Sequence, residues 1–215
     1  MKRWKKLLVI TGLVTLLPMV WGLLLWSRLP GILPTHWGID GQANGYSSRG
    51  MAVFGMPLIL LALQGLCFFG TARDLRNSRI NQKVMTLVLW IIPVISNLVC
   101  GMIYAMALGW ELSPMRGAML IVGALLLSVG NYLPKCRQNG SVGIKMGWVY
   151  TSPENWNATH RFGGKIWVAG GTATLLLAML PQGKWVAAGF IGILTAVMLL
   201  PVGYSYRFYR REERR

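Results

Sequence analysis

The stretch Met85–Gly109, MTLVLWIIPVISNLVCGMIYAMALG, contains no Asp, Glu, Lys, Arg or His. A helix needs about 20 apolar residues to cross a hydrocarbon core of about 30 Å, so this stretch is long enough to span a membrane. Five further apolar stretches lie along the chain: Leu7–Trp26, Met51–Gly70, Gly117–Leu133, Ile166–Leu180 and Trp185–Tyr204. The sequence therefore predicts an all-α integral membrane protein with six transmembrane helices.

The composition supports this class. Of the 215 residues, 54% are hydrophobic and 13% are charged, whereas soluble domains carry about 25% charged residues. This argues against a soluble globular domain, a disordered chain and a secreted disulfide scaffold. The basic N-terminus followed by an apolar stretch also resembles a signal peptide. The stretch is longer than a typical signal core, and no small-x-small cleavage site follows Trp26, so we expect a retained helix.

The charge distribution predicts the orientation. The net charge is +16, and all but four of the 22 lysines and arginines lie at the two ends or in the second and fourth connections. The other four are Arg28, Arg49, Arg116 and Lys184. Because cytoplasmic segments carry the excess of positive charge, both termini are predicted to be cytoplasmic. We divide the chain into 1–84, with two helices and an extracytoplasmic loop at 27–50, and 85–215, with four helices and a cytoplasmic loop at 134–165.

The predicted spans lack central ionisable residues, which pumps and ion-coupled transporters usually keep. Their polar residues are expected to form hydrogen bonds between helices: Gln64, Ser96, Asn97, Ser128 and Asn131. Four prolines are expected to kink helices or free carbonyls: Pro18, Pro57, Pro93 and Pro201. We find no nucleophile elbow, P-loop, HExxH motif or paired intramembrane carboxylates. The sequence thus predicts no enzyme, no cofactor and no metal site.

The first connection, Ser27–Gly50, is predicted to face outward. Its prolines favour extended backbone and its glycines permit tight turns. Polar-tipped aromatic residues among them suit a binding surface. The candidate ligand-binding residues are His36, Trp37, Gly41, Gly45 and Tyr46. The alternative is a loop that Trp37 merely anchors at the membrane interface.

The fourth connection, Pro134–Lys165, is predicted to face the cytoplasm and to end in a short helix. Ser152 is the predicted N-cap and Pro153 the first helical residue. Trp156 and His160 are four residues apart and share a face, with Phe162 close by. One interpretation is an amphipathic segment on the inner leaflet, with basic residues against anionic headgroups: Lys145, Arg161 and Lys165. The other is a structured motif that binds a partner.

Three segments resemble a known family: GNYLPKCRQNGSVGIKMGW (Gly130–Trp148), ENWNATHRFGG (Glu154–Gly164) and LPTHWGIDGQANGYSS (Leu33–Ser48). The first two resemble the signature of the SdpI family of bacterial immunity proteins, and the third resembles the domain found N-terminal in the same proteins. Gln138 stands where a proline is usual, and Met146-Gly147 replaces a usual Thr-Pro. The resemblance assigns a cytoplasmic motif to Asn131, Lys135, Arg137, Asn139, Gly143, Lys145, Trp156, Thr159, His160 and Arg161.

The resemblance implies a multi-pass protein of the bacterial plasma membrane that protects its cell from a secreted killing peptide. The best-known member of the family also acts as a receptor: with toxin bound, it holds a small DNA-binding repressor at the membrane. The resemblance therefore implies a possible receptor role here as well. The expected partners are therefore the lipid bilayer, a secreted peptide toxin and such a repressor, with no direct contact to nucleic acid. The alternative functions are a small transporter or efflux protein and, third, an intramembrane enzyme.

Overall fold

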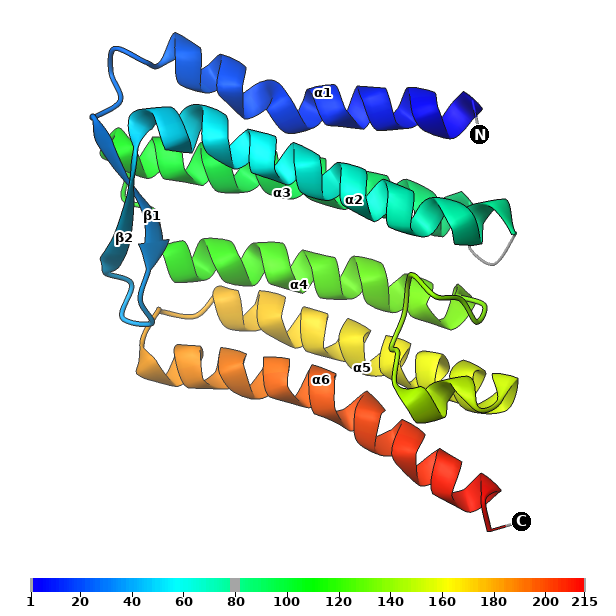
Figure 1. Cartoon of the computed structure of the whole chain (residues 1–215). Helices are drawn as coiled ribbons and strands as arrows, with labels where there is room; N and C mark the ends of the chain where they lie inside the picture. Colours follow the sequence, from blue (N-terminus) through cyan, green and yellow to red (C-terminus); the bar gives the residue numbers. More distant parts are fainter. Residues whose placement is uncertain (1, 78–81, 215) are drawn as a thin grey trace. The chain divides into compact units, whose positions relative to one another are not determined.

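The computed structural model of the chain describes residues 2–77 and 82–214 (Figure 1). The predicted cytoplasmic charges Arg79 and Arg215 lie outside the described residues. The chain forms two compact units. The first comprises the described residues of 1–70 and 86–118, and the second those of 71–85 and 119–215. The division of the chain at residue 84 stays a prediction.

Six long helices make up most of the fold (Figure 1). They match the six apolar stretches of the sequence, and most extend beyond them by several residues. Their bounds are α1 Lys2–Leu24, α2 Met56–Arg76, α3 Gln82–Ala107, α4 Pro114–Tyr132, α5 Pro153–Ala178 and α6 Lys184–Glu212. The short helical turns are a π-helical turn, η1, at Met51–Gly55 and two 3₁₀ turns, η2 at Leu133–Lys135 and η3 at Gly147–Tyr150.

Within the described residues, five helices are long and apolar enough to cross a membrane: α1, α2 with its π-helical turn, α3, α4 and α6. This agrees with a predominantly helical membrane protein, while the count of six spans and the side of the termini stay predictions. The remaining helix, α5, has 26 residues, about 39 Å at 1.5 Å per residue. Its N-terminal half is polar, and the stretch predicted to span, Ile166–Leu180, is the only apolar part.

In the first unit, polar side chains donate hydrogen bonds to backbone carbonyls that two prolines inside helices leave free. A proline leaves the carbonyl four residues earlier without its helical N–H donor. Pro18 thereby frees the carbonyl of Val14, and Asn97 of α3 donates its Nδ2 to that oxygen at 2.8 Å. Pro93 frees the carbonyl of Leu89 in the same way.

The freed carbonyl of Leu89 accepts from Gln64 Nε2 at 3.3 Å, and Gln64 also bonds Thr11 and Thr15 of α1 at 2.6 Å each. Ser96 donates its hydroxyl to the Thr15 carbonyl at 2.8 Å. The predicted bonds between helices are thus confirmed for Gln64, Ser96 and Asn97. Ser128 and Asn131 are exposed instead, and neither makes such a bond to any part of the chain that the structure describes.

In the second unit, glycines let α4 and α5 approach closely. A Cβ added at Gly130 of α4 would lie 3.1 Å from the carbonyl oxygen of Gly164, and one added at Gly171 would lie 2.8 Å from that of Gly123. Each helix therefore presents two glycines seven residues apart to the other. Small residues at membrane helix interfaces permit this backbone-to-backbone packing.

The opposite face of α5 packs on α6. A Cβ added at Gly170 would meet Val197 at 2.3 Å. Pro201 frees the Val197 carbonyl, and Trp167 Nε1 donates to it at 2.9 Å. Helix α5 consequently lies between α4 and α6 (Figure 1). Because two of its faces are covered by protein rather than lipid, α5 needs less hydrophobic surface than its neighbours.

A β-hairpin joins α1 to the π-helical turn in the first unit, an addition to the predicted all-α fold. Strands β1, Ile32–Trp37, and β2, Ala43–Ser48, pair antiparallel. Its base is held by Arg49, whose guanidinium donates to the carbonyls of Trp26 and Leu29 at 2.7 and 3.0 Å. The same guanidinium lies 4.3 Å from the centre of the Trp26 ring, a cation–π contact.

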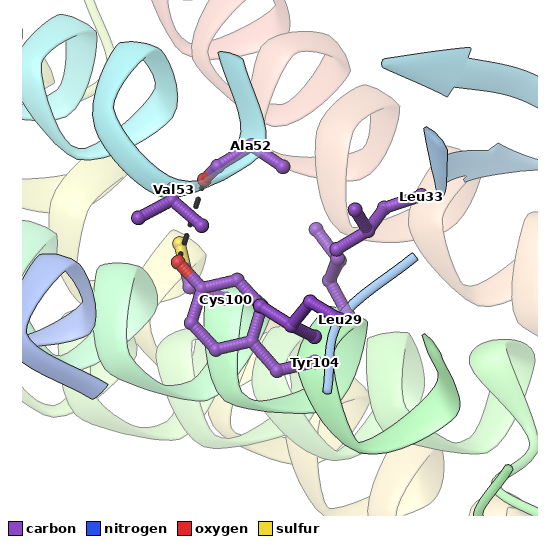
Figure 2. Close-up of a cluster of buried hydrophobic side chains, with 7 residues drawn as sticks. Leu29, Leu33, Ala52, Val53, Cys100 and Tyr104 are labelled. Carbon is purple, nitrogen blue, oxygen red and sulfur yellow. Dashed lines mark hydrogen bonds between the residues drawn. The ribbon is translucent and has the colours of Figure 1, made fainter. Parts of the chain in front are cut away.

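The hairpin is seated on a buried cluster from the connection after α1, from β1, from the π-helical turn and from α3 (Figure 2). Leu33 of β1 is fully buried there, and the Tyr104 hydroxyl reaches the Ala52 carbonyl at 3.5 Å. The cluster consists of Leu29, Leu33, Ala52, Val53, Cys100, Ile103 and Tyr104. The extended backbone expected around Pro34 is confirmed, because Pro34 lies within β1, whereas Pro30 precedes the strand.

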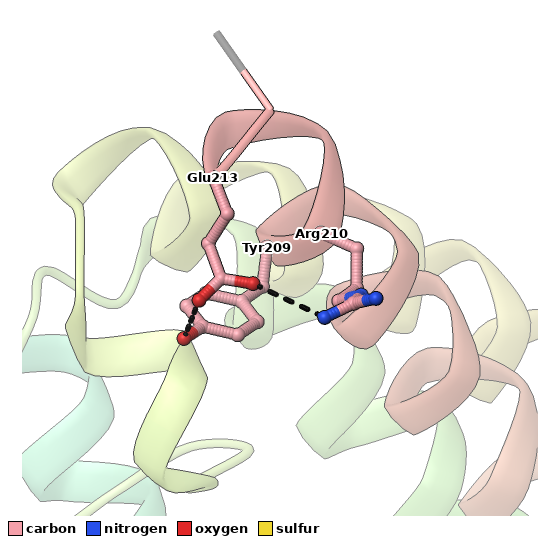
Figure 3. Close-up of polar contacts among 3 residues, drawn as sticks. All are labelled: Tyr209, Arg210 and Glu213. Carbon is pink, nitrogen blue, oxygen red and sulfur yellow. Dashed lines mark hydrogen bonds and ion pairs between the residues drawn. The ribbon is translucent and has the colours of Figure 1, made fainter.

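The C-terminal end of α6 carries a small polar group at the tip (Figure 3). Arg210 pairs with Glu213 at 3.5 Å, and the Tyr209 hydroxyl donates to the same carboxylate. Charged pairs three residues apart add a few tenths of a kcal/mol to a helix. This group therefore helps to extend α6 to Glu212, eight residues beyond the predicted span end at Tyr204.

Candidate functional site

The hairpin residues singled out from the sequence divide into exposed and packed ones. His36 is exposed and its Nδ1 lies 2.5 Å from the Asn44 side-chain oxygen. Tyr46 is 61% exposed. Trp37 is half-buried and packs against the seating cluster. Trp37 is therefore part of the hairpin's foundation as well as a candidate contact, which leaves Tyr46 as the more accessible aromatic residue.

The two candidate glycines of the hairpin have different roles. Gly41 has φ +78° at the turn between the strands, a conformation that glycine adopts without strain. Gly45 pairs with His36 across the strands, and an added Cβ would lie 2.8 Å from the His36 Cβ. One glycine thus forms the turn and the other makes room for the imidazole.

A groove of about 480 Å³ opens in the first unit between α1 and α3. Tyr104, Leu25 and Leu108 line it and also contact the cluster that seats the hairpin. Exposed Trp21 and Trp110 form further walls. The groove is therefore apolar and aromatic, and it lies directly beside the base of the hairpin.

Two polar groups enter this groove. Arg28 is exposed at its lining. Asn97 uses Nδ2 for the carbonyls of Val14 and Pro93 at 2.8 and 2.9 Å. Its Oδ1 makes no hydrogen bond to the described parts of the chain. The groove thus offers one cationic donor and one amide acceptor within apolar walls, which suits an amphipathic ligand.

The loop between α4 and α5 in the second unit is folded around Asn139. The Asn139 Oδ1 accepts from the backbone N–H groups of Ser141 and Val142 at 2.9 and 2.7 Å. Its Nδ2 donates to the carbonyls of Arg137 and Val142 at 2.7 and 3.0 Å. Buried amides that make all their hydrogen bonds fix a single backbone path. Asn139 is therefore a structural residue of the loop.

A buried aspartate, which the sequence analysis did not single out, anchors this loop. Asp74, at the end of α2, accepts from the Gly140 N–H at 3.0 Å and from the Ser141 hydroxyl. Lys145 bridges the carbonyls of Gly140 and Ser141 at 3.0 and 3.3 Å. The signal available in the sequence was an acidic residue among arginines, in a chain that has only 6 acidic residues.

His160 of α5 joins the helix to the loop. Its Nε2 accepts from the Ile144 N–H at 3.0 Å, so Nδ1 carries the proton and donates to the Trp156 carbonyl at 2.8 Å. The imidazole is buried and neutral in this arrangement. Gly143, with φ +130°, passes the ring so closely that an added Cβ would lie 2.3 Å from Nε2.

Trp156 completes the inner layer of the loop. It is fully buried, stacks on His160 with 4.1 Å between ring centres, and donates Nε1 to the Cys136 carbonyl at 2.8 Å. Cys136 is buried, and burial raises the pKa of its thiol to about 11, so this cysteine is a small apolar filler. Thr159 is also buried and donates to Asn155 at 3.0 Å.

Helix α6 holds the other edge of the loop. Trp148 Nε1 donates to the Ser205 hydroxyl at 3.0 Å, and Asn155 Nδ2 donates to the Ser205 carbonyl at 3.3 Å. The Ser152 hydroxyl donates to Glu212 at 2.9 Å and accepts from the Asn155 N–H at 3.0 Å. Ser152 is thus the N-cap of a helix that begins at Pro153, as predicted.

The prediction that this segment forms a short helix separate from the fifth span is wrong, while contact of its basic residues with anionic headgroups stays a prediction. Helix α5 continues without a break from Pro153 to Ala178. Trp156 and His160 do share a face, but that face is buried against the loop. Phe162 lies on a different face and stacks on Tyr204 of α6 at 4.4 Å. The Trp–His pattern marked a protein core and not a lipid contact.

The remaining motif residues form the outer surface of the loop region. Lys135 lies 5.1 Å from the centre of the Tyr132 ring. Arg137 and Arg161 are exposed, as are Asn131 and Lys145. Gln138 donates to the Tyr150 carbonyl at 3.1 Å, a bond that a proline could not make. The motif therefore has a buried layer that shapes the loop and an exposed, basic layer available to partners.

Acidification should weaken the contact between α5 and the loop. Burial lowers the pKa of His160, against the opposing effect of the Trp156 carbonyl. Since the folded state favours neutral imidazole, its stabilisation is complete above the unfolded value of about 6.5 and falls as the pH drops below it. Between pH 7.5 and 5.5, we expect the melting temperature of the wild type to fall more than that of His160→Gln, because the glutamine side chain does not titrate. Equal falls in both proteins would contradict this.

The fold and these two sites define a class: a helical multi-pass membrane protein with an apolar groove beside a hairpin and a structured motif loop. Comparison with known families gives two matches, each to a part of the chain. Residues 135–205 match the SdpI/YfhL protein family, and residues 13–61 match a domain of unknown function, DUF1648. The resemblance drawn from the motifs is thus confirmed, and at family level the match is to membrane proteins of the immunity type. No curated protein and no solved structure matches the chain.

Proposed function

We propose that this protein protects a bacterial cell against a secreted, membrane-active peptide by binding the peptide at the hairpin and its neighbouring groove. The match of residues 135–205 to the SdpI/YfhL family carries the proposal. The mechanism is non-catalytic: the groove takes up the apolar face of the peptide before that face enters the bilayer. Arg28 and Asn97 bind polar groups of the peptide, and Tyr46 contacts it from the hairpin.

The motif loop is the proposed cytoplasmic side of a receptor. A small DNA-binding repressor would bind the exposed basic layer around Lys135 and Arg137. Peptide binding can change this surface only if the two states of the protein differ in affinity for the peptide. Helices α2, α3 and α4 each contribute residues to both compact units, so a change in one unit has continuous chain through which to reach the other.

The peptide-binding role is tested by survival. A sensitive strain with and without this chain is challenged with the secreted killing peptide against which the family's best-known member protects, and with any small secreted peptide encoded beside this gene. Tyr46→Ala should reduce protection about thirtyfold in peptide concentration, because truncating an aromatic anchor costs about 2 kcal/mol. Protein level in the membrane is measured in parallel, since Tyr46 is exposed and its loss should leave the level unchanged.

Three outcomes separate the alternatives. Equal killing with and without the chain would contradict immunity. Full protection by Tyr46→Ala would remove the hairpin from the binding surface. A substrate-dependent flux in proteoliposomes would favour the transporter alternative instead. Trp37→Ala is the less informative variant, because Trp37 also packs on the cluster that seats the hairpin.

The orientation gives a further prediction. Single cysteines at Gln42 in the hairpin turn and at Gly147 in the motif loop, both exposed positions, are treated with an impermeant thiol reagent. With six spans and cytoplasmic termini, the first should react in intact cells and the second only after permeabilisation. Cys67 is replaced beforehand, while Cys100 and Cys136 are buried. Labelling of both from outside would contradict the topology.

A further inference from the structure

A second groove, of about 510 Å³, lies between α5 and α6 in the second unit. Asn157, Arg161 and Lys165 line it from one stripe of α5, each four residues after the last. Tyr204 of α6 lines the other side, and its ring stacks on Phe162 at 4.4 Å with 12° between the planes. The groove thus has a basic stripe on one wall and a paired aromatic surface beside it.

The two basic side chains of this groove make no polar contact with the described parts of the chain. Arg161 and Lys165 are exposed, and neither forms a hydrogen bond or an ion pair with any residue in 2–77 or 82–214. Glu154 lies in the same groove but pairs with neither. By contrast, Lys145 bonds two loop carbonyls. The donors of Arg161 and Lys165 are therefore available to an anion.

The basic stripe lies next to exposed apolar side chains of α5 and α6. Three residues beyond Lys165, Val168 is exposed, and Leu176 further along α5 is 65% exposed. On α6, Leu200 is exposed one turn before Tyr204. Arginine, lysine and tyrosine at such a boundary lie at the depth of lipid phosphates, while the apolar residues lie at the depth of acyl chains.

We propose that this groove is a binding site for an anionic phospholipid. The guanidinium of Arg161 binds the phosphate as a two-donor fork, and Lys165 adds a second positive charge. The side chains of Asn157 and Tyr204 reach hydroxyl groups of the headgroup. The acyl chains lie along the exposed apolar residues of α5 and α6. The proposal does not depend on the immunity function, and it gives the exposed arginine of the motif a ligand.

The full-length protein, purified in a mild detergent, provides the test. Native mass spectrometry compares the retention of phosphatidylglycerol with that of phosphatidylcholine of the same acyl chains. We expect the wild type to prefer phosphatidylglycerol. Arg161→Gln with Lys165→Gln should weaken phosphatidylglycerol binding about thirtyfold, because each basic residue near an anionic surface contributes about a fivefold effect. Both side chains are exposed, and a melting curve confirms that the variant is folded.

A matched control removes the same charge elsewhere. Lys5→Gln with Lys6→Gln deletes two exposed lysines of α1 and should change phosphatidylglycerol binding less than twofold. Arg161→Lys separates a structured site from general attraction: it keeps the charge but loses the fork, so binding should fall about fivefold. Tyr204→Phe provides a further variant that keeps the ring stack and removes only the hydroxyl.

Any one of several results would overturn the proposal. They are equal retention of the two lipids by the wild type, equal losses in the groove and control variants, unchanged binding by Arg161→Lys, and displacement of the lipid by millimolar inorganic phosphate. The last would mean that the groove binds free phosphate and not a lipid. Specific capture of an acidic peptide with no lipid preference would assign the groove to a protein partner instead.

Discussion

Trp156→Ala should be among the most damaging single substitutions in this protein, lowering the free energy of unfolding of the second unit by about 3–5 kcal/mol. The indole has no exposed surface, and its removal leaves a cavity against His160 and Tyr150. It also leaves the Cys136 carbonyl without its donor. Thermal unfolding in detergent measures the loss, and limited proteolysis should show faster cleavage within 137–147 than in the wild type.

Trp156→Phe is the matched control for this substitution. The phenyl ring keeps most of the stacking on His160 and removes only the Nε1 donor, so the loss should be about 1–3 kcal/mol. If Trp156→Ala unfolded within 1 kcal/mol of the wild type, the indole would not be holding the loop. If Phe and Ala were equally damaging, the hydrogen bond to Cys136 would matter more than the packing.

The positions of the helices could be predicted because hydropathy is a local property of the sequence. Stretches such as Met85–Gly109 have to be helical in a membrane, where no water can satisfy the backbone. Their polar residues could be assigned to bonds between helices, but not to particular partners. Nothing local in the sequence says that Asn97 meets the carbonyl freed by Pro18, since 79 positions separate the two residues.

For the predicted cytoplasmic motif, the sequence identified the residues but not which of them are buried. Its residues were found through the resemblance to a known family, but neither the resemblance nor their spacing could separate a partner surface from a core. The same four-residue interval places Trp156 against His160 in the core and Arg161 beside Lys165 on the surface. The loop itself bonds to α2, α5 and α6 through Asp74, His160 and Ser205. These are contacts over long sequence separations, which a single sequence does not reveal.

Gly143→Ala should detach the motif loop from α5. Gly143 has φ +130°, which side-chain-bearing residues rarely adopt, and holding such a residue there costs about 1–3 kcal/mol. The new Cβ would also lie 2.3 Å from His160 Nε2, which breaks the bond from Ile144 at a cost of about 1–3 kcal/mol. We therefore expect a loss of about 3 kcal/mol in thermal unfolding, together with loss of protection in the survival assay.

Two glycine controls and one double variant identify the cause of that loss. Gly147→Ala places a Cβ in open space in the same loop and should stay within about 0.5 kcal/mol of the wild type. Gly41→Ala has positive φ but no neighbour within 4 Å, so it measures backbone strain alone. In a His160→Ala background the collision is gone, so Gly143→Ala should then cost less than it does in the wild type, and only its own backbone strain should remain. Two substitutions that act through one contact are not additive. If Gly143→Ala cost as much in the His160→Ala background as in the wild type, backbone strain and not the imidazole would explain why glycine is needed at this position.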